Sequence, residues 1–293
     1  MKYIYIILFL LITIFTVHAA DKELPSIITA SMLKEALNSK SIIVLDVRKV
    51  EEFKDAHIPG SICLTCMGWQ TIDRHLDCQL PLKDDLEEMV CYTGIKKYKH
   101  VVLVGKQDTE INKSNITRVA WTIKYAGHNN PLILDGGFDS WVSSGYPVEK
   151  DWKKPEKCRE KCKWNEDVLA RKEDVLRAIE KGIVIDARTP SLFSGREIDS
   201  KTKKRGHIPF AINLPFSLIY KDDGKFEDIY TLNVIARKFI GDDKEKEIII
   251  LCCNGRLATS WWFILSEVLG YKKVKVYDGS MEEWCRDEGP LSH

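Results

Sequence analysis

The sequence predicts an α/β protein with two tandem domains, each a central parallel sheet flanked by helices. One observation is an internal repeat, in which "IIVLDVRKVEEFKDAHIPGSI" (42–62) is echoed by "GIVIDARTPSLFSGREIDSKTKKRGHIPFAI" (182–212). A second is the later pair "PLILDGGFDSWVSSGYPVE" (131–149) and "VKVYDGSMEEWCRDEGPL" (274–291). The third is that short β-branched runs alternate with amphipathic segments in each copy, which is typical of parallel strands joined by helical crossovers.

The elements follow in the same order in both copies. Each copy offers three strands, namely 42–46, 101–104 and 132–134 in the first and 183–186, 248–251 and 274–277 in the second. Ahead of each first strand, "SMLKEALNS" (31–39) and "KEDVLRAIEKG" (172–182) have helical spacing of apolar residues. We therefore expect one domain over 24–150 and another over 167–291. The charged segment 151–166, which contains Pro155 and lacks apolar periodicity, is the expected linker.

The amino terminus has the order of a secretory signal peptide over residues 1–20. Lys2 precedes an apolar run over 4–17, and the small residues Ala19 and Ala20 follow. A permanent membrane anchor is the alternative, although a spanning helix usually needs about 20 apolar residues. We expect an exported protein, periplasmic or secreted. The net charge of +1 gives no indication of binding to nucleic acid, and after signal cleavage none of binding to a membrane.

Four motifs in the same order in both halves carry a resemblance to a known family. The combination of "LDVRKVEEFKDAHIPG", "IDAR…GHIP", a strand ending in "ILCCNG" and "YDGSMEEW" resembles the rhodanese superfamily in its tandem thiosulfate or 3-mercaptopyruvate sulfurtransferase form. The resemblance covers residues 25 to 290. It implies two α/β rhodanese-like domains, of which only the second is normally catalytic.

Cys252 is the candidate nucleophile. It follows a strand expected to be buried, at the carboxyl edge where open parallel sheets collect ligands. Gly255 lets the backbone curl so that amide hydrogens converge in front of Cys252, and a helix is expected over 257–270. Amides and a helix N-terminus both stabilise a thiolate, so a thiol of low pKa is expected.

The resemblance implies the chemistry at this cysteine. A thiolate attacks the outer sulfur of an anionic donor, holds it as a persulfide and passes it to a thiophilic acceptor such as cyanide or a thiol, possibly on a protein. No metal and no organic cofactor is required. In the family the loop reads Cys-x-x-Gly, which Cys252 and Gly255 fit. Cys253 is a bystander, a resolving thiol or half of a bridge.

The donor is left open by the sequence. The position where relatives place an arginine before the aromatic residue is Leu192 here, and the loop Cys-Cys-Asn-Gly-Arg-Leu fits neither the thiosulfate nor the mercaptopyruvate pattern. Thiosulfate is slightly favoured because it suits an exported enzyme. The candidate donor-binding residues are Cys253, Asn254, Gly255, Arg256, Leu257, Ala258, Arg188, Arg196 and Lys201.

The first copy has no cysteine directly after its matching strand, where Gly105 and Lys106 stand, and is expected to be non-catalytic. The Asp, Arg and His of the repeated motifs are expected to be structural ion pairs and loop anchors in both copies (Asp46, Arg48, His57, Asp186, Arg188 and His207), with bordering the pocket as the alternative for Arg188 and His207.

Nine cysteines in an exported chain predict structural disulfides with at least one thiol left over. Cys158 and Cys162 are spaced for a local bridge if their segment is helical. Cys63 and Cys66 have the spacing of a redox or haem-attachment motif, but Met67 stands where haem attachment requires histidine. A metal site is the less favoured alternative to disulfides.

Three other functions compete with sulfur transfer. A rhodanese-like phosphatase would need an arginine six residues after the cysteine, where Ala258 stands. A binding module would not need the loop cysteine. The strongest alternative is an exported thiol-redox or persulfide-carrier protein that is loaded by a protein partner.

Overall fold

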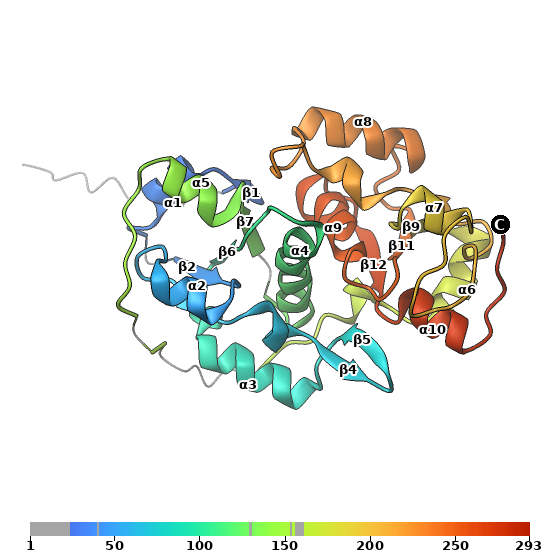
Figure 1. The fold of residues 1–293 in the computed structure, drawn as a ribbon, viewed down its shortest axis with the longest axis horizontal. Helices are drawn as coiled ribbons and strands as arrows, with labels where there is room; N and C mark the ends of the chain where they lie inside the picture. Colours follow the sequence, from blue (N-terminus) through green and yellow to red (C-terminus); the bar gives the residue numbers. More distant parts are fainter. Residues whose placement is uncertain (1–23, 40, 129–130, 153, 156–160) are drawn as a thin grey trace, which may run out of the picture.

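Two α/β halves make up the chain. The computed structural model describes residues 24–39, 41–128, 131–152, 154–155 and 161–293. The halves lie side by side, the first coloured blue to green and the second yellow to red (Figure 1). The predicted signal peptide and several linker positions lie outside the described residues. No helix in the described part of the chain is long and apolar enough to cross a membrane.

Each half is built on a five-stranded parallel sheet. In spatial order the first sheet has β1 (Ile27–Ile28), β7 (Pro131–Leu134), β6 (His100–Val104), β2 (Ile42–Asp46) and β3 (Ile62–Cys63). The second has β8 (Leu169–Ala170), β12 (Lys273–Tyr277), β11 (Glu247–Leu251), β9 (Ile183–Asp186) and β10 (Ile212–Asn213). Because the two orders correspond strand for strand, the predicted duplicated α/β architecture is confirmed.

The strands read from the sequence are correct to within a residue. Strands β2 and β9 have the expected bounds, whereas β6, β7, β11 and β12 begin one residue earlier. All five residues of β6 and four of the five of β11 are buried. Parallel strands buried to this extent need cover on both faces of the sheet, which the helices supply.

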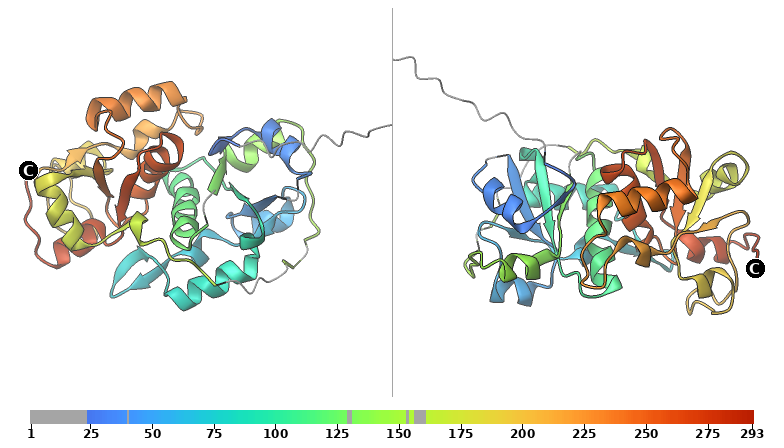
Figure 2. Two further views of the ribbon diagram at one scale, coloured as in Figure 1. Left: turned by 180° about the vertical axis from the view of Figure 1, so that it is seen from behind. Right: turned by 90° about the horizontal axis from the view of Figure 1, so that it is seen from above.

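Helices flank both sheets (Figures 1 and 2). In the first half they are α1 (Ala30–Ala36), α2 (Val50–Asp55), α3 (Lys83–Thr93), α4 (Glu110–Tyr125) and α5 (Gly137–Ser143). In the second they are α6 (Lys172–Lys181), α7 (Pro190–Phe193), α8 (Ile229–Phe239), α9 (Ala258–Trp262), which continues as the π-helix η5 (Phe263–Val268), and α10 (Ser280–Arg286). Short 3₁₀ turns are η1 (Cys66–Trp69), η2 (Ile95–Lys97), η3 (Glu166–Val168) and η4 (Phe216–Ile219).

The halves meet where α4 packs beside α9, at the centre of Figure 1. The hydroxyl of Thr117 lies 2.8 Å from that of Ser260, and Lys124 Nζ is 2.9 Å from Glu267 Oε2. One hydrophobic cluster contains buried residues of both halves, from Ile43 to Val276. The two domains therefore share an apolar interface.

A two-stranded hairpin extends from the first half towards the second and was not predicted. It consists of β4 (Thr71–Asp73) and β5 (Leu76–Gln79), which pair antiparallel, and it points towards α10 (Figure 1). The two residues between the strands, Arg74 and His75, have φ of 48° and 69°, and two consecutive positive values are typical of a type I′ turn. The hairpin brings residues of the first domain to the loop 252–257 of the second domain, which follows β11 and is here called the active loop.

Candidate active site

Cys252 emerges at the carboxyl end of the central strand β11. That strand pairs with β9 on one side and β12 on the other, so the cysteine stands at the middle of the sheet edge. The backbone N–H of Cys252 donates to Ser280 Oγ at 3.1 Å, and its carbonyl accepts from the N–H of Met281 at 3.1 Å. The start of α10 thus fixes the backbone of the cysteine.

The loop after Cys252 curls around its sulfur. Gly255 has φ of +83°, and a Cβ there would lie 2.6 Å from the Asp278 carbonyl oxygen, so the turn requires glycine. The backbone N–H groups of Asn254, Leu257 and Ala258 donate to Cys252 Sγ. This is the convergence of amides that the sequence predicted, with α9 beginning at Ala258.

The expected low pKa of the Cys252 thiol is wrong for this structure. Burial, with an exposed fraction of 0%, is the largest influence and raises the pKa, while the amides of Ala258, Asn254 and Leu257 lower it and the Asp186 charge raises it. An amide nest stabilises a thiolate only against the cost of removing that charge from water. The loop sequence predicted the converging amides but not the tertiary packing that buries Cys252.

The thiol of Cys253 lies beside Asp199. Burial raises the pKa of this thiol, and so do the charges of Cys252 and Asp199. The Asp199 carboxylate lies close enough to act on this thiol, and it accepts from the backbone N–H groups of Lys201 and Thr202 at 2.9 Å. The basic segment 196–207 therefore reaches the active loop through Asp199, a contact that the sequence did not suggest.

The hairpin lies across the loop and is bonded to the second domain. Leu80 N donates to Asp278 Oδ2 at 2.8 Å, and Asp77 N donates to Glu282 Oε2 at 2.9 Å. Asn254 Nδ2 donates to Cys78 Sγ at 3.5 Å. A thiol from the first domain is thus in contact with the loop that holds Cys252.

Two arginines accompany this thiol. Arg118 on α4 is fully buried and its Nη1 pairs with Asp278 Oδ1 at 2.5 Å. Its Nε and Nη2 have no hydrogen-bond partner among the described residues. Arg256 of the loop is half-buried, and its charge, like that of Arg118, acts on both Cys66 and Cys78. Arg118 was missed because no motif marks it.

The other predicted donor-binding residues are dispersed. Arg188 is buried, pairs with Asp186 at 2.6 Å and donates to the Gly206 carbonyl. Burial acts against its charge, but Asp186 and then Cys253 and Cys252 raise its pKa, so it does lie near the thiols. Lys201 is exposed and pairs with Asp77 of the hairpin at 2.5 Å.

Arg196 is exposed, and its Nε donates to Ser194 Oγ at 3.2 Å. No hydrogen bond between its side chain and the active loop is recorded in the described part of the chain. The structure thus places Arg188 and Arg256 near the thiols and leaves Arg196 at the surface.

The first domain repeats the scaffold around a different loop. Arg48 pairs with Asp46 at 2.7 Å, which confirms the predicted ion pair in this copy as in the other. Where β6 ends, Gly105 and Lys106 border a cleft of about 540 Å³. No thiol stands at the position that matches Cys252, and the non-catalytic role of this domain stays a prediction, although Cys66, from the turn after β3, lines the same cleft.

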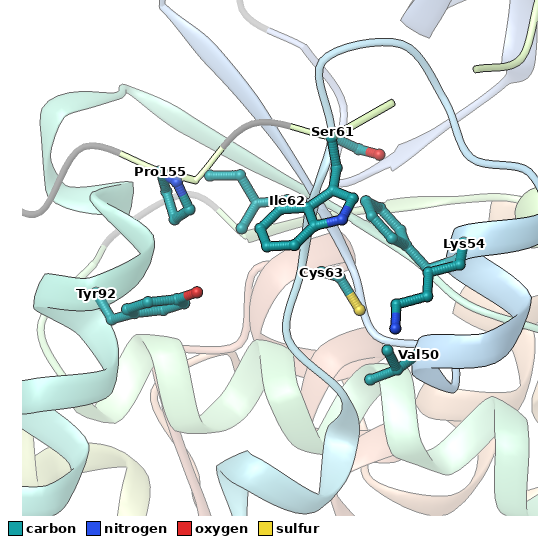
Figure 3. A pocket seen from close by; sticks show the side chains of 9 residues that line it. Val50, Lys54, Ser61, Ile62, Cys63, Tyr92 and Pro155 are labelled. Carbon is teal, nitrogen blue, oxygen red and sulfur yellow. The ribbon is translucent and has the colours of Figure 1, made fainter. Parts of the chain in front are cut away.

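The predicted disulfides are not found among the described cysteines. Cys63, Cys66, Cys78 and Cys285 carry free thiols, and Cys158 lies outside the described residues. Cys63 faces a separate, smaller pocket with Lys54 and Tyr92 (Figure 3), whereas Cys66 packs into the core. The short chain segment between them turns the two side chains to different surroundings, so proximity in sequence does not produce a bridge.

Comparison with known proteins assigns the family. The model of the rhodanese-like domain matches residues 29–144 and 171–287, so the chain belongs to the rhodanese family and carries two of its domains. The domain boundaries expected from the sequence, 24–150 and 167–291, are somewhat wider than these matches and stay predictions.

The relatives give the activity. Proteins of Haloferax volcanii and Mycobacterium tuberculosis named "Putative thiosulfate sulfurtransferase" are each 30% identical, over 83% and 88% of this chain and 85% and 94% of their own length. The chain is a tandem rhodanese sulfurtransferase. The crystal structure of YnjE has the same fold, with a TM-score of 0.78 at 20% identity over 91% of this chain and 68% of that one.

Proposed function

We propose that this sulfurtransferase carries a sulfane sulfur on Cys252 as a persulfide, taking it from thiosulfate or 3-mercaptopyruvate and giving it to cyanide or a thiol. The observation that carries the proposal is the three backbone N–H groups that donate to Cys252 Sγ. Such groups stabilise negative charge on sulfur in a site from which water is excluded.

The donor enters as an anion and leaves as one, so the site needs positive charge close to the loop. Arg256 lies in the loop, and Arg188 and Arg118 are buried around it. Buried guanidinium groups bind an oxyanion more strongly than exposed ones because water competes less. Of the two donors we favour thiosulfate, whose sulfonate end presents three acceptor oxygens to these donors.

Intact-mass measurement tests the proposal. The reduced protein is exposed to thiosulfate or to 3-mercaptopyruvate beside the variants Cys252→Ser and Cys253→Ser. We expect a gain of sulfur that cyanide removes in the wild type and in Cys253→Ser, and none in Cys252→Ser. Loading that persists without Cys252, or no loading with either donor, contradicts the proposal. The latter result together with a readily reduced bond between Cys252 and Cys253 favours the redox or carrier function.

We also propose export from the cell, on the basis of the amino-terminal segment 1–20. Fractionation of cells that express the full chain, followed by amino-terminal sequencing, tests this. A mature chain that begins near residue 21 in the periplasm or medium supports export, and an intact Met1 in the cytosol contradicts it.

A further inference from the structure

One asparagine links two sulfur atoms that come from different domains. The backbone N–H of Asn254 donates to Cys252 Sγ, while its side-chain Nδ2 donates to Cys78 Sγ at 3.5 Å. The two thiols are also electrostatically coupled, since a charge on Cys252 raises the pKa of Cys78. The thiol of Cys78 is therefore a direct neighbour of the active loop.

The hairpin fixes Cys78 from both sides. The residue before it, Asp77, donates its N–H to Glu282 Oε2 at 2.9 Å. The residue after it, Gln79, donates its side-chain Nε2 to the Asp278 carbonyl at 3.2 Å. Cys78 is 8% exposed and has φ of 58°, an unusual backbone conformation that these bonds hold in place. The position is a constrained one rather than a loose surface thiol.

Two arginines act on the Cys78 thiol. Burial is the largest influence and raises its pKa overall, as do the charges of Cys252 and Asp77, while Arg256 and then Arg118 lower it. Arg118 is fully buried and still has two N–H donors, at Nε and Nη2, without a partner among the described residues. Buried donors without an acceptor are uncommon in proteins because each loses its hydrogen bonds to water, so they point to a group that is present at some stage of function.

We propose that Cys78 is a second sulfur carrier, which takes the outer sulfur from Cys252 across the domain boundary. This inference rests on the proposed Cys252 persulfide. It gives the first domain a chemical part in the reaction, because the receiving thiol belongs to that domain.

The transfer needs no further reactant. The Cys78 thiolate attacks the outer sulfur of the protonated Cys252 persulfide, a bond forms between Cys78 Sγ and that sulfur, and the bond between that sulfur and Cys252 Sγ breaks. The electron pair of the broken bond stays on Cys252, which leaves as a thiolate held by the N–H groups of Asn254, Leu257 and Ala258. The proton remains on the transferred sulfur. No net oxidation or reduction occurs, since one persulfide replaces another.

The consequence is a capacity for two sulfur atoms. Once its sulfur has moved to Cys78, Cys252 can react with a second donor molecule. With excess donor and no acceptor we expect the wild type to gain two sulfur atoms, located at Cys252 and Cys78 by peptide mass mapping after alkylation. Cys78→Ser should gain one, at Cys252. Cys66→Ser, which removes another buried thiol beside the same arginines, should still gain two.

Each outcome is decisive. A wild type that loads only Cys252, however long the exposure, overturns the relay and leaves the proposed function intact. Sulfur on Cys78 in Cys252→Ser also overturns it, because the donor would then load Cys78 directly. No loading of any variant overturns the proposed function itself. Cys78→Ala, with its thermal unfolding compared with that of the wild type, separates a lost thiol from a disturbed hairpin.

Discussion

The two domains share a set of equivalent framework contacts and differ where the chemistry lies. His57 and His207 stack on Phe53 and Phe193 with ring centroids 3.8 and 3.7 Å apart, and each ring Nδ1 meets the carbonyl oxygen of that phenylalanine. Yet the second domain has Cys252 after its central strand, and the first has Gly105. Duplication retained the parts that hold each sheet edge and left the loop free to differ.

A second pair of equivalent contacts is made by a tryptophan of α5 in the first domain and one of α10 in the second. Trp141 Nε1 donates to the Pro147 carbonyl at 2.8 Å, and Trp284 Nε1 donates to the Pro290 carbonyl at 2.9 Å. Both indoles are fully buried. The repeated motifs that identify the family in the sequence are thus mainly structural, and they cannot by themselves tell which copy is catalytic.

Breaking the shared ion pair should have the largest effect and should affect both domains alike. Replacing Asp46 or Asp186 with alanine leaves a buried guanidinium unpaired, which costs about 3–5 kcal/mol of unfolding free energy. Urea unfolding measures this. Asp242→Ala, which breaks an exposed pair with Arg237, should cost about 0–1 kcal/mol. A large loss in only one domain contradicts the equivalence of the two frameworks.

Replacing Gly255 in the active loop should lower activity more than replacing Gly60, a glycine of similar φ in the first domain. Gly255→Ala meets the Asp278 carbonyl at 2.6 Å at a positive φ, and a strain of about 1–2 kcal/mol or more should lower kcat/KM for sulfur transfer at least about tenfold. Gly60→Ala has a similar φ of +76° but open space around it. Equal activity losses in the two variants would show that strain alone, and not the loop, is responsible.

Charge after the central strand should matter in only one copy. Arg256→Ala should raise KM for thiosulfate about tenfold, since a hydrogen bond to a charged group contributes about 1.5–3 kcal/mol. Lys106→Ala removes the cation in the matching first-domain loop, where it pairs with Glu52 at 2.5 Å. Steady-state kinetics at fixed ionic strength compares the two. A similar rise in KM for Lys106→Ala would give the first-domain cleft a part in donor binding.

The smallest effect concerns the thiol in the pocket of Figure 3. Burial and then the charge of Asp46 raise the pKa of Cys63 to about 11. Only the thiolate is alkylated, so its reaction with iodoacetamide should quicken about tenfold per pH unit from pH 8 to 10. Cys63→Ala should leave sulfur transfer unchanged. A rate that levels off near pH 9 would mean that the pocket opens to water.

Local patterns made most of the fold predictable. The β-branched runs revealed the six central strands, and the spacing from Cys252 to Gly255 revealed the amide nest, because each depends on neighbours in the sequence. The hairpin around Cys78 and the buried Arg118 could not be found this way. Their partners Asn254 and Asp278 are 176 and 160 residues distant, and nothing in the local sequence records such contacts.

The burial of Cys252 could not be predicted from the local sequence either. Its pKa depends most on its burial, which is a property of the tertiary packing around the loop. The loop pattern indicated a stabilised thiolate, whereas the tertiary structure adds a desolvation cost that the pattern does not contain.

The contact between α4 and α9 also has a consequence for symmetry. Thr117 with Ser260 and Lys124 with Glu267 are both separated by 143 residues, the spacing that also relates Trp141 to Trp284. Each contact therefore joins equivalent positions of the two copies, as across the twofold axis of a dimer. Two identical subunits would place lysine against lysine there. Within one duplicated chain the positions are free to differ, and lysine faces glutamate.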